Sequence, residues 1–296
     1  MPSTRPSVMV IIAASLWGTT GTVAYFLGDL SPVAIGAVTM GFGGLVLAWL
    51  ARDELRAVLG DAQARRWALT GGAAVAVYPL AFYSGMNFAG VAVGNILALG
   101  TGPLIGATLE WAIRKQRLSI GWGLATSIGV LGLIAISSSD HEQTTADSDL
   151  FGLGVALALV AGIAYGIFSY SLGHIAQLGY SARASSGASF GIGAIPLLIV
   201  ALLYVPSLAS SPENWAGLAY LIAGPMVLSY FLFSRALTSL RSSTVLTIAL
   251  VEPAVATLLA IGVVGERFDA AALLGVALVM VSVIVAARTS RIDRSS

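Results

Sequence analysis

Glu252 is the residue of this chain most able to do chemistry, because it is a carboxylate in the middle of a long apolar run, residues 242–263. A charged side chain at the centre of a bilayer costs about 2.5–3.5 kcal/mol of insertion free energy. We therefore expect Glu252 to have a specific structural or functional role. Three roles are open: a protonated group that bonds a neighbouring helix, a partner for the amine of a bound molecule, or a proton carrier. Pro253 frees a backbone carbonyl one turn earlier, which a protonated carboxyl could bond.

Aromatic residues inside other apolar runs form a second group of candidates. They are Trp17, Tyr78, Phe82, Tyr83, Tyr165 and Phe168. Tyr78 and Phe82 are four residues apart and therefore share one face of a helix. The polar atoms of buried Tyr and Trp need partners, which a water-filled cavity supplies. We expect these rings to line a cavity for an apolar or aromatic molecule; packing against lipid or the protein core is the alternative.

Three further polar residues are candidates with strong structural alternatives. Asn95 could bind the carboxylate or amine of a zwitterion, or hold two helices together. Ser169 could line the opposite side of the cavity, although membrane serines more often bond their own backbone. Glu110 precedes Arg114 by four residues, so an ion pair along the helix is its expected role.

The elements that position these residues are long apolar helices. The chain is 57% apolar and only 10% charged, whereas soluble domains carry about 25% charge. A membrane helix needs roughly 20 mostly apolar residues, and ten such runs are present: 7–27, 32–51, 67–86, 90–112, 119–137, 150–172, 182–205, 213–234, 242–263 and 270–287. The sequence therefore predicts an all-α membrane protein with ten transmembrane helices.

The basic residues predict its orientation. If the N-terminus is cytoplasmic, every Lys and Arg except Arg267 falls on the cytoplasmic side of the ten spans. Basic loops resist translocation, so this distribution follows the positive-inside rule. We expect both termini in the cytoplasm, and a bacterial inner membrane as the location.

A polar stretch, residues 137–149, divides the chain into five spans and five spans. Sliding the sequence by 150 residues places Pro103 on Pro253 and Tyr83 on Phe233. Because five is odd, the second half must cross the membrane upside down relative to the first. We predict two inverted five-helix repeats, residues 1–140 and 150–288, an arrangement typical of secondary transporters.

Prolines interrupt the apolar runs at Pro79, Pro103, Pro225 and Pro253. Each removes a helical hydrogen bond and favours a kink. These kinks could serve as hinges between two conformations, or they could fix the curvature of the bundle.

The sequence argues against several other functions. It contains no cysteine, and its two histidines lie outside the apolar runs, so we expect no metal, no cofactor and no catalytic residues. There is no G-x-x-x-x-G-K-[ST] run for ATP, and no H-E-x-x-H or G-x-S-x-G. A net charge of +1 predicts no nucleic-acid partner.

Three short motifs resemble the drug/metabolite transporter superfamily, specifically proteins with two EamA-type repeats. They are Leu16-Trp17-Gly18, Gly102-Pro103 and Leu250-Val251-Glu252-Pro253. The resemblance implies a ten-helix transporter of small metabolites that works as a monomer, with a central cavity between the repeats. The chain looks most like bacterial exporters of aromatic amino acids, although Tyr165 stands where many relatives have tryptophan. Cationic drugs, other metabolites and a channel are the alternatives.

Overall fold

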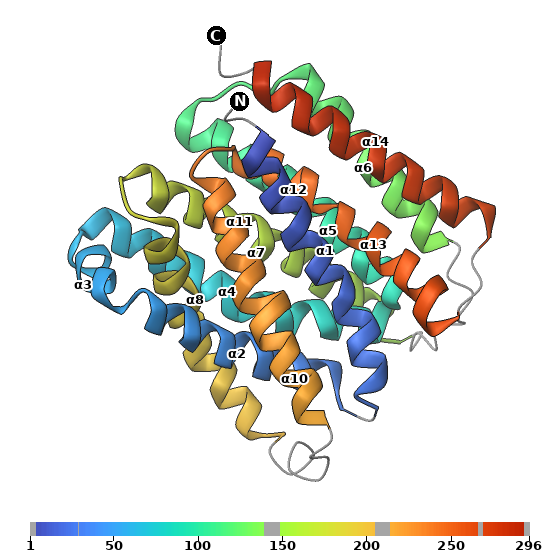
Figure 1. Cartoon of the computed structure of the whole chain (residues 1–296), viewed down its shortest axis with the longest axis horizontal. Coiled ribbons are helices and arrows are strands. Elements are labelled where there is room, and N and C mark those ends of the chain that lie inside the picture. Colours follow the sequence, from blue (N-terminus) through green and yellow to red (C-terminus); the bar gives the residue numbers. More distant parts are fainter. Residues whose placement is uncertain (1–3, 29, 139–148, 205–213, 266–268, 293–296) are drawn as a thin grey trace.

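The protein is an all-helical bundle (Figure 1). The structure, a computed structural model, describes residues 4–28, 30–138, 149–204, 214–265 and 269–292. Its helices are α1 (Thr4–Phe26), α2 (Pro32–Leu50), α3 (Arg52–Gly60), α4 (Ala62–Ala89), α5 (Val91–Arg114), α6 (Ile120–Ser138), α7 (Phe151–Gln177), α8 (Ala182–Leu202), α10 (Trp215–Leu221), η2 (Ile222–Leu228), α11 (Ser229–Leu237), α12 (Ser242–Ala249), α13 (Val251–Leu259), η3 (Ala260–Val264) and α14 (Ala270–Ile292).

The prediction of an all-α membrane protein is confirmed. In the described part of the chain, nine helical segments are long and apolar enough to cross a membrane. The tenth predicted span lies in α4, a 28-residue helix that is less apolar because it carries Pro79, two tyrosines and three glycines. α4 packs against α7 and α8 within the bundle.

Two of the predicted spans are not continuous α-helices. Span 213–234 contains the π-helix η2 between α10 and α11, with Pro225 inside it. Span 242–263 breaks at Leu250, between α12 and α13. Pro253 has no N–H to give to the carbonyl of Ala249, which explains the position of this break. Pro79 and Pro103, in contrast, lie inside uninterrupted helices.

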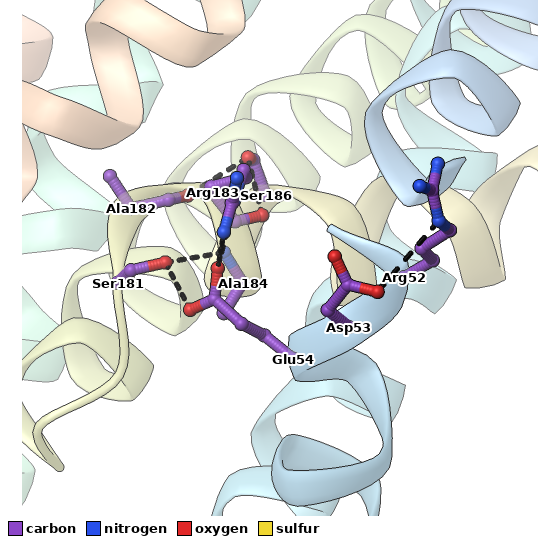
Figure 2. Close-up of polar contacts among 8 residues, drawn as sticks. All are labelled: Arg52, Asp53, Glu54, Ser181, Ala182, Arg183, Ala184 and Ser186. Carbon is purple, nitrogen blue, oxygen red and sulfur yellow. Dashed lines mark hydrogen bonds and ion pairs between the residues drawn. The ribbon is translucent and has the colours of Figure 1, made fainter. Parts of the chain in front are cut away.

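The short helix α3 was not predicted, and it ties the two halves of the chain together. Figure 2 shows Glu54 of α3 facing the start of α8. Its Oε2 accepts a hydrogen bond from Ser181 Oγ at 2.6 Å, and its Oε1 pairs with Arg183 at 2.6 Å. The Ser181 hydrogen bond, followed by the Arg183 guanidinium, lowers the pKa of Glu54. The carboxylate therefore stays charged and holds α3 against α8.

The packing of the helices has the twofold relation expected of two repeats. Figure 1 shows α6 and α14 side by side along one edge of the bundle. α2, the second span of the first repeat, packs in the same way against α8, the second span of the second repeat. The first helix of each repeat packs in the other repeat: α1 packs against α11 and α13, and α7 packs against α4 and α5. Below, the α1 bundle means α1 with α10–α13 and η2, and the α7 bundle means α7 with α4 and α5.

Two glycines show this relation at the level of atoms. A Cβ added at Gly18 would meet the carbonyl of Glu252 and the side chain of Val255. A Cβ added at Gly166 would meet the carbonyl of Gly102 and the side chain of Ile105. The second set lies at the repeat-equivalent positions of the first, so each bundle is closed by the same glycine contact.

The two ends of the bundle differ. Figure 1 places the start of α1, the end of α14 and helix α3 toward one end, here called the α3 end. The turn between α1 and α2 lies at the opposite end.

Glu110 lies near the α3 end, and its predicted ion pair with Arg114 is wrong. Its side chain is buried, and its Oε2 accepts a hydrogen bond from Ser243 Oγ at 2.6 Å. Its Oε1 accepts a hydrogen bond from the Ser243 backbone N–H at 3.1 Å. Ser243 lies in the first turn of α12, where the backbone N–H groups have no partner within the helix. Such N–H groups attract a carboxylate, so Glu110 binds the start of α12 and not Arg114.

Replacing Gly166 with alanine tests the glycine contact. The added methyl group would overlap Ile105 and the Gly102 carbonyl, so we expect a loss of about 1–3 kcal/mol of stability. The measurement is the apparent melting temperature of the purified protein in detergent. Gly123→Ala is the control, because no atom lies within 4 Å of its added Cβ. Equal melting temperatures for both variants would contradict the close packing.

Candidate functional site

A cavity of about 280 Å³ lies between the α1 bundle and the α7 bundle, with α2 along one side. Its wall uses the second half of α1, the first half of α2, the second half of α4 and the first half of α5. Because α1 starts at the α3 end, these segments all lie toward the opposite end. The cavity therefore extends from the middle of the bundle away from the α3 end.

Most of the residues singled out from the sequence meet in this cavity. The residues on its wall are Trp17, Tyr78, Phe82, Tyr83, Asn95, Tyr165 and Glu252, with Pro79, Pro225 and Pro253. Phe168, Ser169 and Pro103 do not line it. Residues from six different spans thus converge on one space, as expected for a cavity lined by the aromatic residues.

Trp17 joins the two repeats across the α1 bundle. Its Nε1 donates a hydrogen bond to the backbone carbonyl of Pro225 at 2.7 Å. Pro225 lies in the π-helix η2, where the Ser229 backbone N–H bonds the neighbouring carbonyls of Gly224 and Met226. The widened turn leaves the Pro225 carbonyl to the indole. The unusual backbone of this span therefore has a definite partner.

Aromatic rings form a continuous wall contributed by both bundles. From the α1 bundle, Trp17 lies with its ring centroid 4.9 Å from that of Tyr230 and 5.4 Å from that of Phe233. From the α7 bundle, Tyr78 lies 5.4 Å from Tyr165 and stacks on Phe82 at 5.5 Å. These distances are typical of favourable aromatic pairs. The wall can enclose a flat apolar group.

Buried aromatic rings close the cavity toward the α3 end. Phe168, Phe190 and Phe233 are each 0% exposed. Phe168 contacts Tyr78 and Tyr165, with ring centroids 5.7 and 5.3 Å away. Phe168 therefore supports the wall from behind, and Ser169 lies beyond it with a side-chain oxygen that is buried and unpartnered.

Among the residues that the structure describes, Glu252 is the only acidic residue that lines the cavity. It lies in the first turn of α13, directly after the break at Leu250. Among the described residues, its carboxylate forms no hydrogen bond and no ion pair. A carboxylate that faces an aromatic cavity without a protein partner is free to bind an ammonium group or a proton.

The remaining polar groups on the wall are neutral. Asn95 faces the cavity from α5, and Thr20 and Thr39 face it from α1 and α2. The Thr39 hydroxyl already donates to the carbonyl of Ile35 at 2.7 Å. No Lys, Arg or His is among the lining residues in the described part of the chain. The wall thus combines one acid, neutral hydrogen-bonding groups and aromatic surface.

The sequence analysis missed Tyr230, which contacts Trp17, Phe168 and Phe190 and lines the cavity. Its position in an apolar span, three residues before Phe233, was the available signal. Met40 and Met226 also line the cavity, where flexible thioether side chains adapt to different ligands.

The described residues include no group of three His, Cys, Asp or Glu that could hold a metal ion. Ser185 and Ser186 are buried and bond backbone carbonyls of their own helix, as membrane serines commonly do.

Trp17→Phe tests the bond between the repeats. The variant keeps an aromatic ring but leaves the Pro225 carbonyl without its donor, so we expect a loss of about 1–3 kcal/mol. The apparent melting temperature in detergent measures this, with Trp215→Phe as the control, because Trp215 is 53% exposed. If both variants melt at the same temperature, the indole bond contributes nothing to stability.

Comparison with known proteins agrees with this architecture. The model of the EamA-like transporter family matches residues 5–138 and 152–288. The chain is 32% identical over 299 residues to the uncharacterized transporter YwfM of Bacillus subtilis (strain 168), covering 98% of this chain and 96% of that protein. A solved crystal structure has the same fold, with a TM-score of 0.79, 17% identity and 97% of both chains covered. This chain is a member of the EamA-like transporter family.

Proposed function

We propose that this protein is a secondary transporter that exports small organic solutes with an aromatic or other apolar body, foremost aromatic and large neutral amino acids. The observation that carries the proposal is the unpartnered carboxylate of Glu252 on a wall of aromatic rings. The carboxylate would bind the ammonium group of the substrate, and the rings would enclose its side chain. Asn95 and the Thr20 hydroxyl, which also line the cavity, would donate hydrogen bonds to the substrate carboxylate.

The direction of transport rests on charge. At the α3 end lie helix termini and loops that carry Arg52, Arg56, Arg114, Arg183 and Arg241. Basic segments stay in the cytoplasm, so we assign the α3 end to the cytoplasmic side of a bacterial inner membrane. The one exception, Arg267, lies outside the described residues. The cavity then extends toward the external side, as expected for the state that releases an exported substrate.

The packing supports alternating access by two mixed bundles. The first helix of each repeat packs in the other repeat, so the two repeats are not separate rigid bodies. The α1 bundle and the α7 bundle are therefore the better candidates for the moving bodies. The cavity lies between them, so a change in their relative tilt would open one end and close the other.

Organic cations are a second candidate class of substrate. They are favoured by one observation: the cavity-lining residues in the described ranges include a carboxylate and no basic side chain. A substrate without a carboxylate would need no basic partner. Amino acids and organic cations are thus separated by the need for a carboxylate on the substrate.

Counterflow in liposomes tests the proposal. We expect purified protein to exchange labelled phenylalanine or leucine saturably across the membrane, and a pH gradient to reveal any proton coupling. Competition by phenethylamine, which lacks the carboxylate, separates the two substrate classes. Exchange of the amine alone would favour organic cations. Non-saturable flux would indicate a channel, and no exchange of either class would overturn the proposal.

Tyr78→Ala should weaken substrate binding. The variant removes a ring that contacts Tyr165 and Phe82 on the cavity wall, so we expect the half-saturation concentration to rise about tenfold. Tyr25→Ala is the matched control, because Tyr25 is 64% exposed and does not line the cavity. An unchanged half-saturation concentration in Tyr78→Ala would remove the ring from the binding site.

Glu252→Gln should abolish saturable exchange while leaving the protein folded. The amide has the same shape but cannot attract an ammonium group as a carboxylate does. Exchange is measured by counterflow and folding by the melting temperature, with Asp53→Asn as the control for an exposed acid. Normal exchange by Glu252→Gln would contradict a role in binding or coupling.

A further inference from the structure

A second cavity, of about 170 Å³, lies at the α3 end between α5, α7, α11 and α12. Its wall is polar and includes Glu110, Arg114, Tyr170, His174 and Arg241. It shares no lining residue with the central cavity in the described part of the chain. Its position in the repeat is informative, because spans four, six, eight and nine are the repeat equivalents of spans nine, one, three and four. Those four spans form most of the wall of the central cavity.

This second cavity, here called the inner cavity, therefore lies at the repeat-equivalent position of the central cavity, but at the α3 end. At the opposite end, the start of α5 and α13 both line the central cavity. At the α3 end, the equivalent space is closed, because α5 packs directly against α12. A Cβ added at Gly106 would lie 3.3 Å from the backbone nitrogen of Ser243. α5 and α13 do not pack against each other to a comparable extent.

We propose that the inner cavity is the cytoplasmic mouth of the transport route, and that the Glu110–Ser243 contact is the latch that keeps this mouth closed. This inference rests on the proposed transport function. The latch joins the two bundles, since Glu110 belongs to α5 and Ser243 to α12. Both carboxylate oxygens are used, one by a side chain and one by a backbone N–H. Hydrogen bonds to a charged group are the stronger class of protein hydrogen bond.

The latch has no counterpart at the external end. Shifting Glu110 and Ser243 by 150 residues leads to Ala260 and Val93, whose side chains cannot form hydrogen bonds. The two mouths therefore differ in their side chains, although equivalent helices of the two repeats form them. This asymmetry biases the protein toward the state open to the outside, and a substrate arriving from the cytoplasm must open the latch.

A buried segment separates the inner cavity from the central one, and its polar atoms fit a closed passage. Ser169 on α7 and Ser234 on α11 are 0% exposed, and their side-chain oxygens have no partner. The Ser242 hydroxyl, on the wall of the inner cavity, lies 3.4 Å from the Ser169 carbonyl. Buried hydroxyls without partners are costly. They gain water or substrate as partners when the two bundles separate here.

Cysteine accessibility tests the latch, because the chain has no cysteine of its own. Ser169→Cys serves as the inner reporter and Thr20→Cys as the outer reporter. A membrane-impermeant thiosulfonate is added to inside-out vesicles for the first and to intact cells for the second. In the presence of Glu110→Ala, we expect labelling of the inner reporter to rise about tenfold and labelling of the outer reporter to fall. Ser243→Ala keeps the backbone bond, so its effect should be smaller but in the same direction.

Ser186→Ala is the matched control, because its hydroxyl is also buried near the α3 end but bonds only its own helix. Inner labelling in folded Ser243→Ala equal to that in Ser186→Ala would overturn the latch, even if Glu110→Ala did not fold. The labelling needs no substrate. A shift in labelling without amino-acid counterflow would support the latch and reject the substrate class. Counterflow with unshifted labelling would reject the latch alone.

Discussion

The fold depends on the requirement that every backbone N–H and C=O in hydrocarbon has a partner. Helices meet it everywhere except where the protein provides another partner. Two interruptions in the described spans fall in such places. The π-helix η2 presents the Pro225 carbonyl to Trp17, and the break at Leu250 lies directly before Glu252 on the cavity wall. Both interruptions thus lie at the wall of the central cavity, whereas the π-helix η3 lies at the end of the ninth span.

The helix packing occurs twice, once in each repeat, whereas each of the two acidic residues Glu110 and Glu252 occurs in one repeat only. Gly18 and Gly166 close the two bundles with equivalent contacts. Glu252, in contrast, corresponds to Gly102, and Glu110 corresponds to Ala260. A symmetric fold can alternate between two equivalent states, and in the proposed mechanism the unequal residues decide which state is favoured and what is bound. The two acids have separate places, one on the cavity wall and one at the α3 end.

The sequence was sufficient for the helices, the repeat and most of the cavity wall, because polar and aromatic residues in apolar runs are conspicuous. Trp17, Tyr78 and Glu252 were found in this way. The π-helix was not, since Pro225 predicts a kink but not its form. Glu110 was assigned to a local partner because its true partner, Ser243, lies 133 residues away. Contacts of this kind depend on how helices pack, which a single sequence does not encode locally.

The most direct test of alternating access between the two bundles is a pair of spin-label distances in liposomes. One pair, at Tyr25 and Val91, spans the external mouth, and the other, at Gln177 and Ser239, spans the α3 end. During substrate exchange, we expect a population in which the external distance is shorter and the inner distance longer than in the resting protein. Distances that stay fixed, or that lengthen and shorten together at both ends, would contradict alternating access between these bundles.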